Sequence, residues 1–304
     1  MQVLRYNNFM KRLYFLALVS FLFFGCDDNK IPSYAPQAKT KEFRVYKVGI
    51  HPYLNSAKMY EAHRPILDYV ENHLSDVQLV LETSLDYADY ETKLYRGDFD
   101  FSLPNPYQSV LAIEKGYDVI ARMKPDEVFR GIIVARKDSR IKTVADLKGK
   151  AVSFPAPTAL AATMMPLYFL HQNGLDTQRD IKKKFVGSQF SSILNAYSKD
   201  TVAGATWPPP WELWKKENPQ KASEMEVIWQ TQPLINNSIV VKRGVDPEIV
   251  AQLRRLLLEL DTTPQGQKLL ENAGFAGFRD AKNEDYDVVI EFLHRYDEAM
   301  GVQR

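Results

Sequence analysis

The chain of 304 residues has a single cysteine, Cys26, so no disulfide can form within it. Neither charge is in excess, because 39 basic residues face 38 acidic ones and the formal net charge is +1. Basic blocks interleaved with aromatic residues are also missing, which argues against nucleic acid as a partner. With 45% hydrophobic and 25% charged residues, the composition is that of a globular protein of roughly two domains.

The motifs of common enzymes are missing as well. The sequence has no Gly-x-Ser-x-Gly element and no phosphate-cradling loop of the nucleotide-binding kind. His63 and His73 share one predicted helix, but ten residues of helix rise about 15 Å, too far for two ligands of one metal ion. We expect both histidines at the surface. We therefore predict no catalytic residue, no metal site and no cofactor.

The N-terminal segment has the pattern of an export signal. Lys11 and Arg12 precede a run of apolar residues that ends at Gly25, which predicts a secretory signal over residues 1–25. The run is short for a membrane span. Met10 stands directly before the basic pair and is an alternative start of translation.

Cys26 follows this apolar run directly. A small residue before the cysteine resembles the lipobox of bacterial lipoproteins, whose cysteine thiol receives a lipid anchor with palmitate-like chains. Phe23 stands where that pattern usually has Leu, and a chance cysteine after an ordinary signal is the alternative. Residues 26–42 then have the polar composition of a tether. Asp27 resembles an inner-membrane retention signal, so we expect an anchor at the periplasmic face of the inner membrane.

From Phe43 onward, short β-rich segments alternate with longer segments of helical periodicity. Residues 43–50 alternate apolar and polar side chains as a strand does, and residues 57–74 place apolar side chains at helical spacing. The alternation resumes at the strand pattern of residues 129–140. Strands that alternate with helices predict an α/β fold with a largely parallel sheet.

Three separated segments, taken in order, resemble one protein family. Residues 94–112, 129–154 and 234–278 are similar to the phosphate, phosphite and phosphonate (PhnD-like) substrate-binding proteins of ABC transporters. The resemblance extends over residues 43–304. It implies a type II periplasmic-binding-protein fold, in which two α/β lobes are joined by two crossover segments and close around a ligand in the cleft between them.

The same resemblance sets the expected lobe boundaries. The first lobe is expected to comprise residues 43–139 plus 235–304, and the second residues 140–234. The crossovers are then expected near residues 136–141 and 232–236.

In open α/β sheets, ligands bind where loops leave the carboxyl ends of strands. Two such loops in the first lobe offer Tyr53, Asn105 and Tyr107 as ligand contacts. His51 lies in the first of these loops, and we expect it to make a local hydrogen bond rather than to contact the ligand.

A third loop, "SFPAPTALAATMMP" at residues 153–166, precedes a predicted helix. Relatives that hold a phosphonate usually have a Pro-x-Ser-Thr-Ser-Gly element here, and Pro157 and Pro166 keep its proline spacing. The hydroxyl and glycine positions of that element are occupied by Ala159, Leu160, Ala161 and Ala162. We predict contacts from Thr158, Ala159, Leu160 and Thr163, in an oxyanion loop that has lost its hydroxyls.

The fourth loop has changed in the same direction. Gln189 stands where relatives commonly have a histidine, and Ala203 where they have an acidic residue. We predict ligand contacts from Gln189 and from Trp207, which begins "WPPPWELW". We expect the three prolines to hold an extended segment, and Trp211 and Trp214 to pack as one helical face against the second lobe.

These observations favour a monomeric binding protein for a small molecule over an enzyme. One candidate partner is the permease of an ABC transporter, and the alternative is a membrane sensor kinase that detects the ligand-bound state. The sequence does not separate transport from sensing. Since the hydroxyls of the third loop are missing, we expect a cargo other than a tightly held phosphonate.

Overall fold

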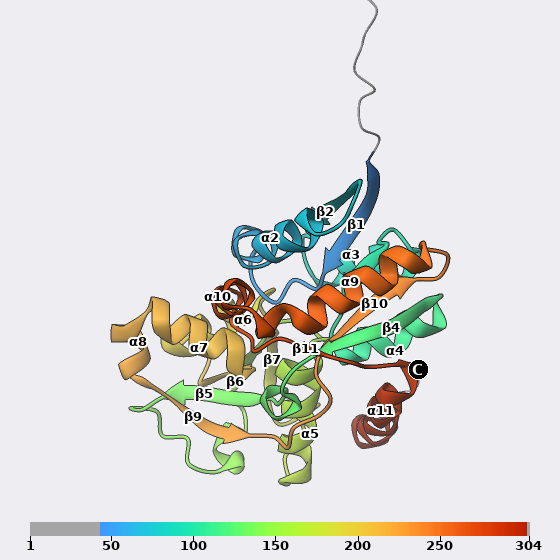
Figure 1. Cartoon of the computed structure of the whole chain (residues 1–304). Coiled ribbons are helices and arrows are strands. Elements are labelled where there is room, and N and C mark those ends of the chain that lie inside the picture. The colour runs from blue at the N-terminus through green and yellow to red at the C-terminus, as the bar shows by residue number, and fades with distance from the viewer. Residues whose placement is uncertain (1–42, 303–304) are drawn as a thin grey trace, which may run out of the picture. The chain divides into compact units, whose positions relative to one another are not determined.

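The computed structural model describes residues 43–302, in which eleven strands form two sheets with ten α-helices around them (Figure 1). The α/β fold class is confirmed. The predicted signal, the lipidated cysteine and the tether lie outside the described residues. No helix within residues 43–302 is both long enough and apolar enough to cross a membrane.

The first sheet has the strand order β11-β4-β10-β3-β1-β2. Its strands are Arg44–Ile50 (β1), Val77–Glu82 (β2), Phe101–Leu103 (β3), Tyr117–Met123 (β4), Ser238–Lys242 (β10) and Phe278–Arg279 (β11). The second sheet has the order β7-β6-β8-β5-β9. Its strands are Ile132–Arg136 (β5), Ala151–Phe154 (β6), Lys182–Phe185 (β7), Ala203–Thr206 (β8) and Met225–Gln230 (β9).

The expectation of a largely parallel sheet is wrong for both sheets. Parallel pairing joins β1 to β2 and β3, and β6 to β7 and β8. Antiparallel pairing joins β10 to β3 and β4, β11 to β4, and β5 to β8 and β9. The antiparallel strands include β4, β5, β9 and β10, which are the strands on either side of the two passages between sheets. The chain leaves one sheet and enters the other at these passages. The connections between these strands are therefore not βαβ crossovers, which join parallel strands of one sheet.

Helices cover both faces of the first sheet. They are Ser56–Asn72 (α2), Pro247–Glu259 (α9) and Pro264–Ala273 (α10) on one face, and Tyr87–Arg96 (α3), Pro106–Glu114 (α4) and Asp287–Met300 (α11) on the other. In α2, the buried residues Met59, Ala62, His63 and Ile66 recur at helical spacing, so His63 belongs to the inward face. The expectation of a surface His63 is therefore wrong, whereas His73 is exposed as predicted.

The second sheet is also covered on both faces. Its helices are Met165–Gln172 (α5), Gln189–Tyr197 (α6), Pro208–Glu217 (α7) and Pro219–Ser223 (α8). Alternate residues of β5 face opposite ways: Ile132 and Val134 pack with Trp211 and Trp214, whereas Ile133 joins the cluster that contains α5. This alternation explains why β5 is an almost continuous apolar run in the sequence.

The tryptophans of α7 pack as expected, but the prolines before them do not form an extended segment. The Trp211 and Trp214 rings stack at 5.6 Å between centroids, with both side chains buried. Pro208 and the two prolines after it form the first turn of α7, and Trp207 is the N-cap residue. Proline is tolerated there because the first N–H groups of a helix have no partner within it.

The chain changes sheets twice, and the first change lies earlier than expected. Since β5 pairs only within the second sheet, the passage runs between Met123 and Ile132 rather than near residues 136–141. The second passage runs between Gln230 and Ser238. The lobe boundary at residue 139 is thus wrong for β5, which belongs to the second sheet.

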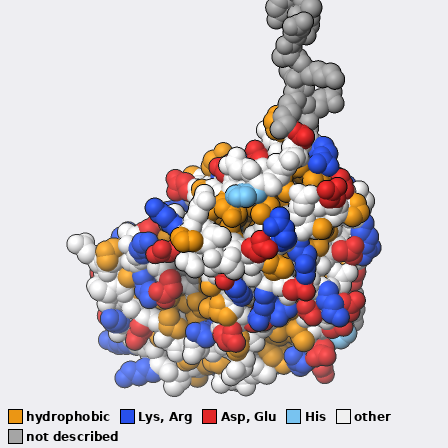
Figure 2. All heavy atoms as spheres, viewed as in Figure 1, with side chains coloured by type: hydrophobic (Ala, Val, Ile, Leu, Met, Phe, Trp, Pro, Cys, Tyr) orange, Lys and Arg blue, Asp and Glu red, His pale blue; other side chains and the backbone are white. Residues whose placement is uncertain are grey.

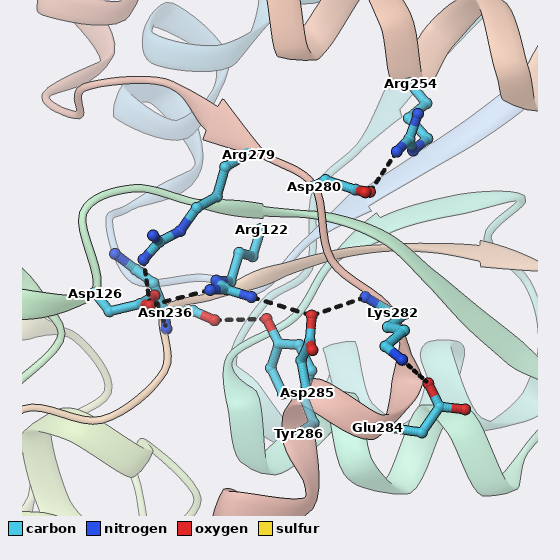
Figure 3. Close-up of polar contacts among 10 residues, drawn as sticks. All are labelled: Arg122, Asp126, Asn236, Arg254, Arg279, Asp280, Lys282, Glu284, Asp285 and Tyr286. Carbon is cyan, nitrogen blue, oxygen red and sulfur yellow. Dashed lines mark hydrogen bonds and ion pairs between the residues drawn. The ribbon is translucent and has the colours of Figure 1, made fainter.

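A polar network joins the two passages (Figure 3). Asp126, in the first passage, accepts a hydrogen bond of 3.1 Å from the backbone N–H of Asn236 in the second. The same carboxylate pairs with Arg279 and, at 3.3 Å, with Arg122. Arg122 in turn pairs with Asp285 at 3.1 Å. One carboxylate therefore connects both passages to strands β4 and β11.

Asn236 is held from two further directions. Its side-chain amide donates to the carbonyl of Pro125 at 2.9 Å, and its own carbonyl accepts a hydrogen bond of 2.6 Å from the Tyr286 hydroxyl. Tyr286 is buried, and that burial raises the pKa of its phenol. The second passage is thereby fixed to the start of the C-terminal helix as well as to the first passage.

We predict that Asp126→Asn lowers the free energy of unfolding by about 1–3 kcal/mol, because two partly buried guanidinium groups lose their shared carboxylate. Urea denaturation measures this change. Glu284→Gln is the matched control: it removes an exposed acid drawn in Figure 3 and should shift the value by less than about 0.5 kcal/mol. Equal effects of the two variants would contradict a structural role for Asp126.

Candidate functional site

A small cavity lies between the two sheets, where loops from both converge. His51, Tyr87 and Asn105 follow strands β1, β2 and β3 of the first sheet. The second sheet contributes the helix start at Ala159–Ala162, together with Gln189 and Trp207, and the passages contribute Phe129 and Asn237. The free space at its centre is about 10 Å³, close to that needed for one water molecule.

The structure brings five of the nine sequence-predicted contacts to this cavity. They are Asn105, Ala159, Leu160, Gln189 and Trp207. Their role as ligand contacts stays a prediction, since the structure contains no ligand. Trp207 is buried and packs against Phe129 at 5.6 Å between ring centroids.

The other four predicted contacts lie behind or beside the cavity wall. Tyr53 is buried, with its hydroxyl hydrogen-bonded to His63 Nε2 at 2.8 Å and its ring edge-on to Trp207. Tyr107 is half-buried on α4. Thr158 is half-buried and Thr163 is fully buried, with no hydrogen-bond partner for the Thr163 hydroxyl among the described residues.

Besides His51, five further residues line the cavity that were not predicted as contacts. They are Tyr87, Phe129, Ala161, Ala162 and Asn237. Tyr87 begins a helix that follows a strand, so the position of its loop could have indicated it. Phe129 and Asn237 belong to the passages between sheets, and their position depended on where the chain changes sheets.

His51 makes the expected local hydrogen bond and also lines the cavity. Its Nδ1 lies 2.8 Å from the carbonyl oxygen of Leu103. Because a carbonyl can only accept, Nδ1 carries the proton, and Nε2 retains its lone pair when the ring is neutral. Burial lowers the pKa of His51 to about 4, so the ring is neutral at pH 7.

The helix at the third loop begins as a π-helical turn, Leu160–Met164, that continues into α5. The N–H groups of Thr163 and Met164 both donate to the carbonyl of Ala159, at 2.7 and 3.3 Å. The N–H groups of Leu160, Ala161 and Ala162 lead this turn and have no backbone acceptor among the described residues. No side chain caps the turn, since its N-cap residue is Ala159.

The first passage packs directly against the π-helical turn. A Cβ atom on Gly131 would lie 2.4 Å from the carbonyl oxygen of Ala161 and 2.7 Å from Cδ of Pro166. Only glycine allows so close an approach. The passage between sheets and the wall of the cavity are therefore in direct contact.

Several contacts join the two sides of the cavity. The Asn105 side chain donates to the carbonyl of Thr158 at 3.1 Å, and the Gln189 amide lies 3.4 Å from the Tyr87 hydroxyl. Lys58 of α2 also pairs with Glu217 of α7. The structure is thus that of a closed cleft.

Glu91 lies beside these contacts. Its carboxylate accepts a 2.9 Å hydrogen bond from Gln108 and interacts with the side chain of Thr158. Burial raises the pKa of Glu91 despite these bonds. None of the residues that line the cavity in the described part of the chain is Lys, Arg, Asp or Glu. Within residues 43–302, no group of three or more His, Cys, Asp and Glu residues could hold a metal ion.

Comparison with known proteins gives a consistent picture. Residues 48–286 match the family model described as "ABC transporter, phosphonate, periplasmic substrate-binding protein". One curated relative is the probable ABC transporter phosphite binding protein PhnD1 of Prochlorococcus marinus, 25% identical over 57% of this chain and 63% of its own length. Another is the phosphonates-binding periplasmic protein of Escherichia coli, 23% identical over 57% of this chain and 52% of its own. The matches thus span about half to three-fifths of these relatives.

Solved structures share the two-lobed fold. A binding protein component of an ABC phosphonate transporter from Pseudomonas aeruginosa superposes with a TM-score of 0.78 at 16% identity, covering 85% of this chain and 88% of its own. PhnD1 of Prochlorococcus marinus in complex with methylphosphonate gives 0.75 at 22% identity, covering 84% and 98%. At these identities the likeness supports the fold alone.

We predict that stability falls as the pH is lowered from 7 to 5. Burial lowers the pKa of His63 to about 3 and that of His51 to about 4, whereas an unfolded histidine titrates near 6.5. The unfolded state therefore takes up protons first, and each histidine should cost about 2 kcal/mol of stability by pH 5. Urea denaturation at pH 7, 6 and 5 measures this loss.

The variant His63→Gln can keep a hydrogen bond to Tyr53 and should remove about half of the histidine-dependent loss. His294→Gln, at an exposed position of α11, is the matched control and should leave the pH dependence as it is. Identical pH dependence in wild type and His63→Gln would show that His63 is not held neutral.

Proposed function

Because the chain belongs to the family of periplasmic substrate-binding proteins of ABC phosphonate transporters, we propose that it captures a small molecule in the cavity between its two sheets and delivers it to a permease. Capture takes place by closure of the two lobes. The free space of about 10 Å³ in the closed cleft is too small for such a molecule, so the ligand requires a wider separation of the two sides. We expect it to be neutral or weakly charged, rather than a tightly held phosphonate. The proposal includes a lipid anchor at Cys26.

The observation that carries this proposal is the composition of the helix start at the cavity. Ala159–Ala162 present methyl and isobutyl groups, and no hydroxyl, beside the leading N–H groups of the turn. A hydrogen bond to a charged oxygen contributes roughly 1.5–3 kcal/mol, so a site without two or three hydroxyl donors loses on the order of a thousandfold in affinity for an oxyanion. The leading N–H groups alone contribute less than this.

The rest of the cavity supports the same ligand class. A buried dianion without a charged partner has a large desolvation cost, and the lining residues carry no charge. Trp207, Phe129 and Tyr87 instead provide large aromatic surfaces. Such surfaces favour a planar or less polar molecule that stacks on them.

Lobe closure is supported by the contacts that cross the cleft. Asn105 to Thr158 and Lys58 to Glu217 both join the first side of the cleft to the second. The two passages between sheets are short and tied to each other, as hinges of such proteins are. Ligand in the cavity would add contacts to both sides and so favour the closed state.

The ligand class is tested by calorimetry of the purified protein against phosphate, phosphite and methylphosphonate. We expect no dissociation constant below about 1 µM for these anions. The double variant Ala159→Ser/Ala161→Ser should gain about tenfold or more for methylphosphonate, because it restores two hydroxyls beside the leading N–H groups. Ala156→Ser is the matched control at a buried alanine that does not line the cavity. Submicromolar binding of methylphosphonate by the wild type would refute the proposal.

The lipid anchor is tested by fractionation of cells that express the full chain. The wild type should sediment with membranes, and Cys26→Ala should appear in the soluble fraction because it has no thiol to acylate. Ser33→Ala, in the expected tether, should sediment like the wild type. Retention of Cys26→Ala in the membrane fraction would overturn the anchor.

A further inference from the structure

A second and much larger hollow lies away from the cleft. It is bounded by α5, by residues 230–234 at the start of the second passage, and by the C-terminal helix α11. We call it the hinge groove. Its volume is about 500 Å³, within the range of roughly 300–1,000 Å³ typical of small-molecule sites. It shares no lining residue with the cavity between the sheets.

Aromatic side chains from two helices form one part of the hinge groove. Tyr168 of α5 and Phe292 of α11 meet edge to face, with 5.6 Å between ring centroids. Phe169 is half-buried and also lines the groove, with 6.5 Å between its ring centroid and that of Trp229. These rings give a planar apolar molecule a surface to stack on.

The polar part of the hinge groove carries one charge. Arg295 is exposed on α11 and makes no ion pair with any described residue. No acidic residue is among the described residues that line the groove, whereas Gln172, Gln230 and Gln232 provide exposed amides. The groove thus has an unpaired guanidinium with hydrogen-bonding groups around it, which is a suitable arrangement for a carboxylate.

We propose that the hinge groove is a second small-molecule site, which takes a planar aromatic carboxylate. The ring lies against Tyr168, Phe169 and Phe292, and the carboxylate binds Arg295. The surrounding amides supply further hydrogen bonds. The site is separate from the cleft and its existence does not depend on what the cleft binds.

The hinge groove borders elements that belong to both sheets. Helix α5 continues the π-helical turn that lines the cleft, and residues 230–234 lead into the second passage. Helix α11 also packs against α4 of the first sheet. An occupant therefore contacts elements that belong to both sheets.

The test is isothermal titration calorimetry of the full chain, purified in detergent, with benzoate, 1-naphthoate and indole-3-acetate as probes. At least one of them should bind with a dissociation constant below about 1 mM, and benzamide should bind more weakly than benzoate. Arg295→Gln should weaken binding at least tenfold, since it removes a charge-assisted hydrogen bond. Arg179→Gln, a change of the same kind at an exposed arginine outside the groove, should leave binding unchanged.

A second variant tests whether the ligand occupies the groove itself, independently of the charge of Arg295. Gln232→Trp places a bulky side chain at an exposed position of the wall and should abolish binding of all three carboxylates. Absence of binding for every probe at millimolar concentration would overturn the proposal. So would carboxylate binding that is unaffected by both Arg295→Gln and Gln232→Trp.

Discussion

The carboxylate of Asp126 is the interaction that ties the two passages between the sheets to each other and to the first sheet. It joins the first passage to Asn236 in the second, and it neutralises Arg279 and Arg122 on two strands of the first sheet. Both connections between the sheets are therefore tied to each other at one point. The cavity lies beside this tie, with Phe129 and Asn237 on its wall.

Small residues allow the segments around the cleft to pack closely. Gly131 lets the first passage approach the carbonyl of Ala161, which belongs to the π-helical turn that lines the cavity. The N–H groups of Leu160, Ala161 and Ala162 have no backbone acceptor among the described residues, and the side chains of these three residues carry no hydroxyl. None of the described residues that line the cavity is Lys, Arg, Asp or Glu, and three of them, Tyr87, Phe129 and Trp207, are aromatic.

Much of the fold could be predicted because local signals and tertiary packing agree. The alternation in β1, the helix that ends at Gly97 and the apolar stripe of α11 all depend on side-chain periodicity and turn residues, which are visible in the sequence. The pairing directions of β4, β5, β9 and β10 were not predictable in this way. They depend on where the chain leaves each sheet, and a buried strand such as β5 has the same apolar pattern in either sheet.

The residues of the candidate site were also predictable only in part. Ala159, Leu160 and Trp207 were predictable because their loops follow strands. The burial of His63 depends on which face of α2 turns inward, and the position of the wall residue Asn237 depends on where the chain changes sheets. The most direct test of the account is native mass spectrometry, with a crystal structure, of the protein together with the molecule that co-purifies with it. We expect an uncharged or weakly charged molecule stacked beside Trp207. A phosphonate whose oxygens bind the N–H groups of Leu160, Ala161 and Ala162 would contradict it.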